Sequence, residues 1–268
     1  MFNPKQNLHA LKATELKNYF VSLFDQISMK HGYYNAFDHF LDCTINGFCP
    51  NYSVQIMDHI RSVYAEDERF RFGEMIKIWI LSMNQKVTDD HSFHDFFGNF
   101  YEEQSITKQK GFAQYFTPEP ICQLLASIIY GSSERETLLE PACGSGRLNL
   151  AFHSINHKCF HHANDLDITC AKMTALNFVM HGVKGIVTCD DGLWPTKSFR
   201  GAFLVNYTSA PFIEYIPDSK TAYFLLNSIL PTKQEIQIKE SVKPLGIEPL
   251  GKVKFSSMSE MGTQLNLF

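Results

Sequence analysis

The hydrophobic positions of this chain change their spacing at about residue 106. In residues 1–105 they recur every three or four positions, the repeat of one face of a helix. One such stripe consists of Leu8, Leu11, Leu16, Phe20, Phe24 and Ile27, and another of Met75, Ile76, Trp79, Ile80 and Met83. Ser53 precedes a further apolar repeat and is the expected N-cap of that helix. Residues 1–105 are therefore expected to form a helical N-terminal domain whose stripes pack together as a core.

From residue 106 to residue 230, short apolar runs alternate with amphipathic segments. The expected strands are residues 136–140, 158–163, 185–189 and 201–206. The expected helices are residues 119–130, 147–155, 167–181 and 219–230. This alternation predicts an α/β fold with a mostly parallel sheet covered by helices. Residues 231–268 show weak periodicity and are expected to form a short C-terminal tail.

Composition limits the classes of protein to consider. Of the 268 residues 44% are hydrophobic, enough for one sizeable core and a smaller helical unit. The net charge is -4, with most of the negative charge in residues 1–105. A protein that binds DNA on its own usually has a clearly basic surface. The charge therefore does not support strong independent DNA binding.

The location of the protein is also suggested by its sequence. No apolar run approaches the roughly 20 residues needed to span a bilayer. The N-terminal residues lack the basic and apolar regions of a signal peptide. The seven cysteines are scattered and odd in number. We therefore expect reduced thiols, no association with membranes and a cytoplasmic location.

A loop of small residues lies where one expected strand ends and a helix begins. It reads Glu140-Pro141-Ala142-Cys143-Gly144-Ser145-Gly146. Small residues let a ligand approach the backbone closely, and a helix start presents unpaired N–H groups. Asp165 lies 19 residues after Gly146, close to the spacing of about 20 expected for a carboxylate that holds ribose hydroxyl groups. The loop and the acid together predict a site for an adenosine-containing ligand.

The details of the loop favour a nucleoside joined to an amino acid over a dinucleotide. A dinucleotide fingerprint would place a third glycine where this chain has Asn149. Glu140 can accept hydrogen bonds from the amine of an amino acid, whereas it would repel a pyrophosphate.

Further stretches accompany this loop in a fixed order. Gly111 to Pro118 lies before the loop, and Ala163 to Asp167, Ala171 to Gly182 and Asp190 to Leu193 lie after it; Asp95 to Glu102 precedes the whole set. In order and spacing the set resembles the N6-adenine DNA methyltransferases, most closely the modification subunits of type I restriction systems. The resemblance covers roughly residues 95–212.

This resemblance implies a Rossmann-like class I methyltransferase core that binds S-adenosylmethionine. The segment expected to close over the methionine end is Gln114, Tyr115, Phe116, Thr117 and Pro118. The residues expected around the amino-acid end are Glu140, Pro141, Ala142, Cys143, Gly144 and Gly146. Asp165 and Leu166 are expected at the ribose, and Asp191 and Leu193 beside the adenine ring of the cofactor.

The loop that would hold the target base is the least regular part of the resemblance. The family uses Asn, Asp or Ser, then Pro-Pro, then an aromatic residue, and this chain has no intact copy. The preferred placement is Ser209, Ala210, Pro211 and Phe212, because it keeps the Pro-aromatic pair. The alternative, judged by distance from the preceding strand, starts at Asn206. Few residues follow this loop, so a truncated sheet and no separate target-recognition domain are expected.

Two main functions follow from these residues. The first is adenine-N6 methylation of DNA, with the target chosen by a separate recognition subunit or through oligomerisation. The second is that of an accessory or regulatory protein, which binds S-adenosylmethionine but whose degenerate transfer loop no longer orients a base. A weaker third is methylation of a glutamine side chain or a small amine. No metal is expected, because the His and Cys residues at 153–162 lack a second pair of ligands at a typical spacing.

Overall fold

The computed structural model describes residues 7–50, 52–89, 91–104, 106, 114–131, 136–194, 197–208 and 212–229. The expected tail at 231–268 and three residues of the expected transfer loop, Ser209, Ala210 and Pro211, lie outside this set.

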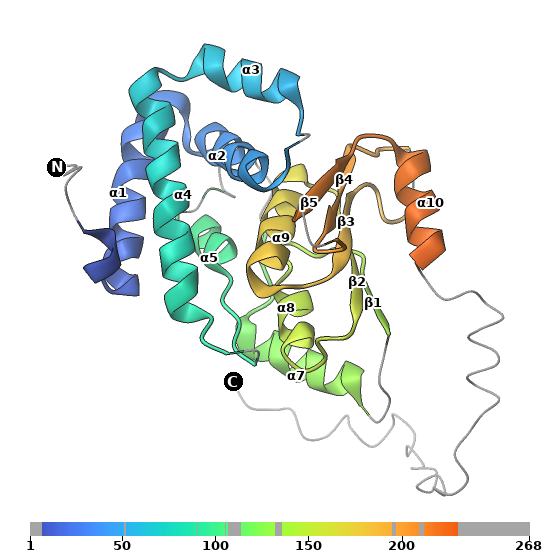
Figure 1. The fold of residues 1–268 in the computed structure, drawn as a ribbon. Coiled ribbons are helices and arrows are strands. Elements are labelled where there is room, and N and C mark those ends of the chain that lie inside the picture. Colours follow the sequence, from blue (N-terminus) through green and yellow to red (C-terminus); the bar gives the residue numbers. More distant parts are fainter. Residues whose placement is uncertain are drawn as a thin grey trace, which may run out of the picture. The chain divides into compact units, whose positions relative to one another are not determined.

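The helical part follows the apolar stripes of the sequence. After a short 3-10 turn at Leu8–Ala10 it contains α1 (Ala13–His31), α2 (Tyr33–Phe48), α3 (Val54–Val63), α4 (Glu66–Lys86) and α5 (Phe96–Glu103). Figure 1 shows α1 and α4 side by side, where their apolar stripes pack together. Ser53 is the N-cap of α3, and its hydroxyl accepts a hydrogen bond from Ile56 N. The predicted helical N-terminal part and this cap are confirmed.

The second part is a five-stranded sheet with helices on both faces. Its strands are β1 (Thr137–Glu140), β2 (Phe160–Asp165), β3 (Gly185–Cys189), β4 (Gly201–Val205) and β5 (Ile213–Ile216), in that spatial order. Its helices are α7 (Glu119–Tyr130), α8 (Arg147–His153), α9 (Ile168–His181) and α10 (Ser219–Ile229). The α/β fold class is confirmed.

The directions of the strands differ from those expected for this sheet. The pairs β1–β2 and β2–β3 are parallel, but β4 runs antiparallel to β3, and β5 antiparallel to β4. Two parallel neighbouring strands must be joined by a long crossover connection, usually a helix. The described residues of the connection 190–200 between β3 and β4 form no helix. This short connection suits an antiparallel β4. The expectation of a mostly parallel sheet is therefore wrong for β4, and β5 was not expected.

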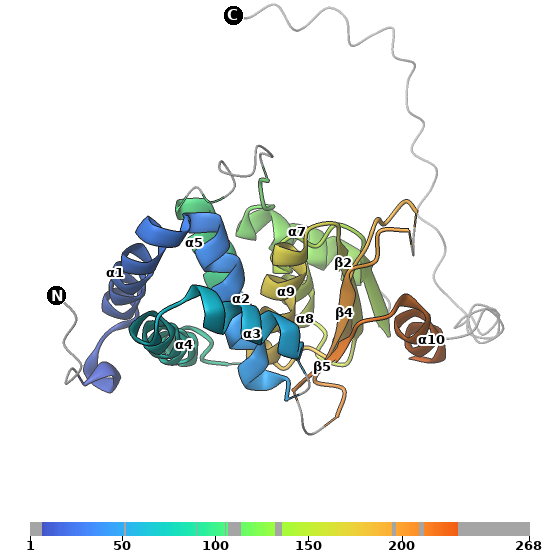
Figure 2. The same cartoon turned by 90° about the horizontal axis from the view of Figure 1, so that it is seen from above.

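One hydrophobic core continues from the helical part into the sheet. Phe20 and Phe37 belong to the same buried cluster as Val187 and Phe203. Figure 2 shows α9 between the helical part and the sheet, with α10 on the opposite face. Buried Lys172 on α9 also forms ion pairs with α2. The boundary at residue 105 between two domains stays a prediction.

Candidate functional site

Parallel strands bring two acidic side chains to one edge of the sheet. Glu140 is the last residue of β1, and Asp165 is the last residue of β2. Since the two strands are parallel neighbours, both residues lie at the carboxyl edge, where α/β proteins usually bind ligands. Asp165 Oδ2 accepts a 2.8 Å hydrogen bond from Gly144 N in the loop after β1. The structure thus brings together the acid and the loop that were paired from the sequence.

Two glycines give this loop its shape. Gly144 has a φ of 56°, and Gly146, the N-cap of α8, has a φ of 82°. Both values lie in the left-handed region that favours glycine. A Cβ atom on Gly144 would lie 2.8 Å from the ring of Phe116, and one on Gly146 would lie 2.9 Å from Thr174. The loop therefore depends on glycine for both its conformation and its close packing.

The electrostatics of this edge favour a ligand that donates hydrogen bonds. Burial raises the pKa of Glu140, opposed by the N–H group of Ala142 and reinforced by the charge of Asp165. Burial also raises the pKa of Asp165, opposed by the N–H groups of Asp167 and Gly144. Ammonium and hydroxyl groups stabilise such partly buried carboxylates in their ionised form. The two acids therefore fit the amine and the sugar hydroxyl groups of a nucleoside joined to an amino acid.

The segment before α7 is held between the helical part and the core. Gln114 Nε2 donates to Asp167 Oδ2 at 3.0 Å, and Gln114 Oε1 accepts from the hydroxyl of Tyr101 at 3.2 Å. The N–H group of Phe116 donates to Glu102 Oε1 at 3.2 Å, and its ring stacks on that of Tyr101 with centroids 5.9 Å apart. The ring of Phe116 is therefore fixed in position against the glycine loop.

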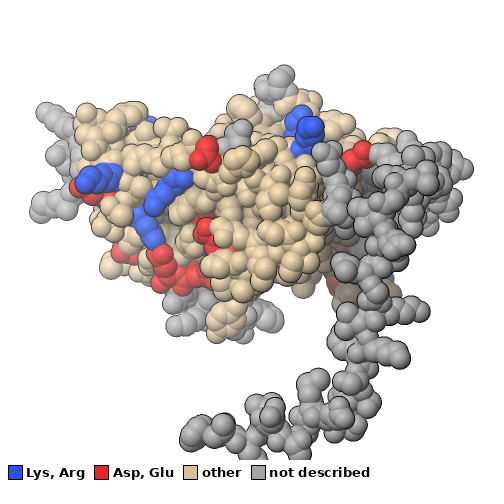
Figure 3. All heavy atoms as spheres, turned by 90° about the horizontal axis from the view of Figure 1, so that it is seen from below, with Lys and Arg blue, Asp and Glu red and all other residues tan. Residues whose placement is uncertain are grey.

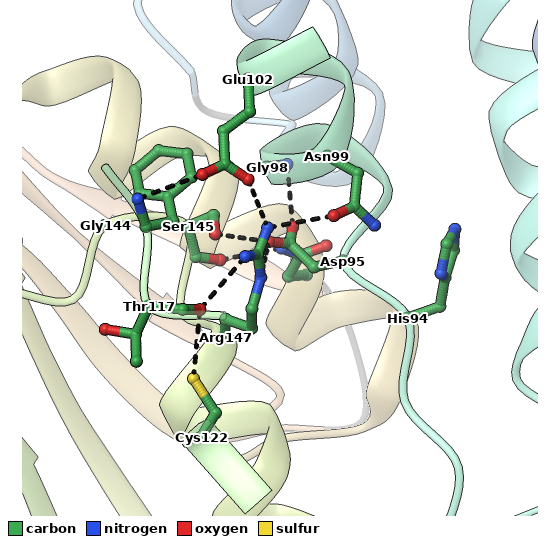
Figure 4. A network of polar contacts seen from close by, with 12 residues as sticks. His94, Asp95, Gly98, Asn99, Glu102, Thr117, Cys122, Gly144, Ser145 and Arg147 are labelled. Carbon is green, nitrogen blue, oxygen red and sulfur yellow. Dashed lines mark hydrogen bonds and ion pairs between the residues drawn. The ribbon is translucent and has the colours of Figure 1, made fainter. Parts of the chain in front are cut away.

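A buried polar network supports the loop from beneath (Figure 4). Asp95, the N-cap of α5, accepts hydrogen bonds from Ser145 Oγ and from Arg147 Nε, the latter at 2.9 Å. Arg147 also donates at 3.1 Å to the carbonyl of Thr117 and to Glu102 Oε2. Neither Asp95 nor Arg147 has a role that was predicted from the sequence. The available signal was an acid before an apolar helix, together with an arginine directly after the last glycine of the loop.

Most of the predicted cofactor residues line one pocket. These are Gln114, Tyr115, Phe116, Thr117, Glu140, Ala142, Cys143, Gly144 and Asp165. Pro118, Pro141 and Gly146 are their neighbours in the chain, and the carbonyl of Pro118 accepts the first hydrogen bonds of α7.

Three other predicted residues do not line this pocket. Leu166 is 57% exposed and Leu193 is 85% exposed. Asp191 forms the turn after β3, where its side chain accepts from Leu193 N at 2.9 Å. The expected place of Leu166 at the ribose, and of Asp191 and Leu193 beside the adenine ring of the cofactor, stays a prediction.

The described residues of the expected transfer loop lie at the amino edge of the sheet, where the parallel strands β1 to β3 begin. In the β3–β4 pair, Val205 is opposite Gly185, the first residue of β3, and Gly201 is opposite Cys189, the last. Asn206 directly follows β4, and Phe212 directly precedes β5. Both residues therefore lie about 13 Å along the sheet from the carboxyl edge. The expectation that they meet the cofactor site is therefore corrected by the direction of β4.

Asn206 has a structural task at that edge. Its side-chain Nδ2 donates to the carbonyl groups of Phe178 and Val183, at 2.8 and 3.0 Å, where α9 ends. Its backbone N–H group donates to the carbonyl of Phe212 and closes the loop. The ring of Phe212 is half exposed and meets Phe48 of α2 edge to face. These contacts tie both residues to the fold, away from the pocket.

The described residues offer neither a metal site nor a membrane span. No cluster of three or more His, Cys, Asp or Glu residues there could hold a metal ion. No helix in the described ranges is long and apolar enough to cross a membrane.

Comparisons with known proteins point to one family. Residues 89–200 match the family model "N-6 DNA Methylase". Type II methyltransferase M.AccI of Acinetobacter calcoaceticus is 37% identical over 90 residues, which cover 32% of this chain and only 15% of that protein. A Listeria monocytogenes structure described as a class I S-adenosylmethionine-dependent methyltransferase covers 68% of this chain and 55% of that chain, with 14% identity and a TM-score of 0.41. This last similarity is weak.

Proposed function

Because this chain belongs to the N6-adenine DNA methyltransferase family, whose cofactor is S-adenosylmethionine, we propose that it binds this cofactor and takes part in adenine-N6 methylation of DNA. The observation that carries the proposal is the hydrogen bond between Gly144 N and Asp165 Oδ2 at the carboxyl edge of the sheet. It joins the loop and the carboxylate that would hold the two ends of the ligand.

Each part of the pocket has a distinct task in this proposal. Glu140 would accept from the amine of the methionine portion, and Asp165 from the ribose hydroxyl groups. Phe116 packs against the glycine loop, where an aromatic face can stabilise the positive sulfonium group. The bound cofactor supplies an activated methyl group. The residues of the chain bind and orient it.

The cofactor part of the proposal is tested by equilibrium dialysis with tritium-labelled S-adenosylmethionine. Glu140→Gln keeps the size of the side chain and removes its charge, so we expect at least a tenfold loss of affinity. Glu136→Gln, an exposed acid just before β1, is the matched control and should bind as the unchanged chain does. Equal affinity of the Glu140 variant and the unchanged chain would contradict the role of Glu140.

Binding and recognition of DNA are proposed to need a further component. Figure 3 shows basic side chains scattered on the face drawn, without a broad basic area. Affinity for DNA depends largely on basic contacts to phosphate groups. We therefore propose that a separate recognition subunit selects the target, in a system resembling type I restriction-modification. The matching family model ends at residue 200, before any residue assigned to base binding.

A second candidate is a cofactor-binding accessory protein that does not transfer methyl groups. The position of Asn206 and Phe212 at the opposite sheet edge favours it, because methyl transfer requires the base to lie against the methyl group. Transfer of labelled methyl groups to unmethylated DNA separates the two candidates. Transfer that is lost in Ser209→Ala and Phe212→Ala supports the enzyme. Cofactor binding without transfer supports the accessory role.

A further inference from the structure

A series of hydrogen bonds leads from the helical part to the acid expected at the ribose. The hydroxyl of Tyr101 on α5 donates to Gln114 Oε1 at 3.2 Å, and Gln114 Nε2 donates to Asp167 Oδ2 at 3.0 Å. The backbone N–H group of Asp167 donates in turn to Asp165 Oδ1 at 2.9 Å. These four residues form the Tyr101–Asp165 network. It starts on α5, which lies beside α9 in Figure 1, and ends at the pocket.

The chemistry of these groups fixes the direction of the side-chain bonds. The carboxylate of Asp167, when ionised, can only accept, so the amide group of Gln114 must turn its Nε2 toward it. The carbonyl oxygen of Gln114 then faces Tyr101, where it needs a donor. Burial raises the pKa of Tyr101, and the charge of Asp167 raises it further. The hydroxyl of Tyr101 therefore keeps its proton and serves as that donor.

The two aspartates of this network are each held through both carboxylate oxygens. Asp167 is the N-cap of α9, and its Oδ1 accepts from Thr169 N at 3.1 Å while its Oδ2 accepts from Gln114. These donors restrain Asp167 and with it the direction of its own N–H group. Asp165 accepts from that N–H group on Oδ1 and from Gly144 N on Oδ2. Each oxygen of Asp165 retains a second lone pair for a ligand.

We propose that Tyr101 and Gln114 are positioning residues that act through Asp167. They orient the carboxylate of Asp165 toward the ribose hydroxyl groups, an inference that rests on the proposed binding of S-adenosylmethionine. A carboxylate accepts from two hydroxyl groups well only when its direction is fixed, because hydrogen bonds weaken steeply away from their preferred angles. Tyr101 acts on the ligand indirectly, since its side chain is inaccessible to solvent and does not line the pocket.

A positioning role differs from a purely structural one in its effect on ligands. If the network only stabilised the fold, loss of the Tyr101 hydroxyl would weaken all ligands of the pocket alike. A positioning role confines the loss to ligands that carry ribose hydroxyl groups. Tyr52 offers a comparison, because its buried hydroxyl donates to Asp42 Oδ1 at 2.6 Å and Asp42 pairs with Lys172 of α9. Tyr52→Phe therefore removes another buried hydroxyl that helps to join the helical part to α9.

The test is calorimetric titration of S-adenosylhomocysteine and of its analogue that lacks both ribose hydroxyl groups. Tyr101→Phe should lose about tenfold in affinity for S-adenosylhomocysteine, the size of one hydrogen bond to a charged group, and keep its affinity for the analogue. Gln114→Met should show the same loss of selectivity. Tyr52→Phe, the matched control, should keep the selectivity of the unchanged chain.

A double variant tests whether the two residues act together. Because Tyr101 acts through Gln114, the variant with both substitutions should lose no more selectivity than Gln114→Met alone. Circular dichroism of every variant shows that the fold is intact.

Three outcomes would overturn the positioning role while leaving cofactor binding intact. One is a Tyr101→Phe variant with the selectivity of the unchanged chain. Another is an equal loss of selectivity in Tyr52→Phe, which would mean that any weakened contact with the helical part has this effect. The third is additive losses in the double variant, which would mean that the two side chains act separately.

The unchanged chain separates this inference from the proposed function. If it binds both ligands equally, Asp165 does not hold the ribose hydroxyl groups, and the positioning role is overturned with that assignment. If it binds neither ligand, the proposed function itself fails.

Discussion

The guanidinium group of Arg147 lies 2.9 Å from the carboxylate of Asp95, and both side chains are nearly inaccessible to solvent. The pair joins the first turn of α8 to the N-cap of α5, which are far apart in the sequence. Because Arg147 also holds the carbonyl of Thr117, the pair links the helical part, the glycine loop and the segment that carries Phe116. The pocket therefore depends on residues of the helical part as well as on the sheet.

Removing this pair should destabilise the protein strongly. Arg147→Met leaves the carboxylate of Asp95 buried without its cation, which costs about 3–5 kcal/mol in comparable cases. Arg61→Met breaks a pair whose side chains are 61% and 63% exposed, so it should cost less than about 1 kcal/mol. Urea unfolding followed by circular dichroism compares the two. Equal, small losses in both variants would contradict a structural role for the buried pair.

Gly144→Ala should weaken cofactor binding more than it weakens the fold. The added methyl group would be 2.8 Å from the ring of Phe116 in a backbone conformation that alanine rarely adopts, so the ring must move away from the loop. We expect at least a tenfold loss of affinity for S-adenosylhomocysteine. Gly47→Ala adds a methyl group inside α2 where no atom lies within 4 Å, and is the control. Unchanged affinity in Gly144→Ala would show that the ligand does not use this loop.

Stability should fall as the pH decreases from 7 to 5. Burial lowers the pKa of His161 to about 3, so the folded state keeps this ring neutral, whereas the unfolded chain gains a proton below about pH 6.5. The folded pKa lies below the unfolded one, so protons favour the unfolded state throughout this window. His161 alone should make the protein about 2 kcal/mol less stable at pH 5 than at pH 7.

The measurement for this prediction is urea unfolding at both pH values. His161→Phe keeps an aromatic ring among Phe152 and Phe178 and removes the titrating group. The loss of stability on acidification should be smaller in this variant by about the same 2 kcal/mol. A variant with the full pH dependence of the unchanged chain would show that His161 is not the source.

Local patterns in the sequence were sufficient to predict most of the helices and strands. α7 and β3 begin and end at the expected residues, because a helix repeat and a short, mostly apolar strand can each be recognised from nearby residues. The expected strand at 158–163 begins two residues later in the structure, as β2. The meeting of Gly144 and Asp165 could also be predicted, because parallel strands carry both residues to one edge.

Other features depend on distant contacts. Every residue of β4 is buried, so its apolar pattern is the same for either strand direction. The direction, and with it the place of Asn206, follows from pairing with β3 and from the carbonyl groups at the end of α9. The Asp95–Arg147 pair joins segments 52 residues apart, and no local pattern connects them.

The central claim is that Asp165 and the glycine loop hold S-adenosylmethionine at the carboxyl edge of the sheet. Calorimetric titration of S-adenosylhomocysteine into the unchanged chain, Asp165→Ala and the control Asp58→Ala, which changes an exposed acid of α3, tests it most directly. We predict micromolar binding to the unchanged chain and to the control, and a loss of at least a hundredfold in Asp165→Ala. Equal affinity of Asp165→Ala and the unchanged chain, or no binding to any of the three, would contradict the claim.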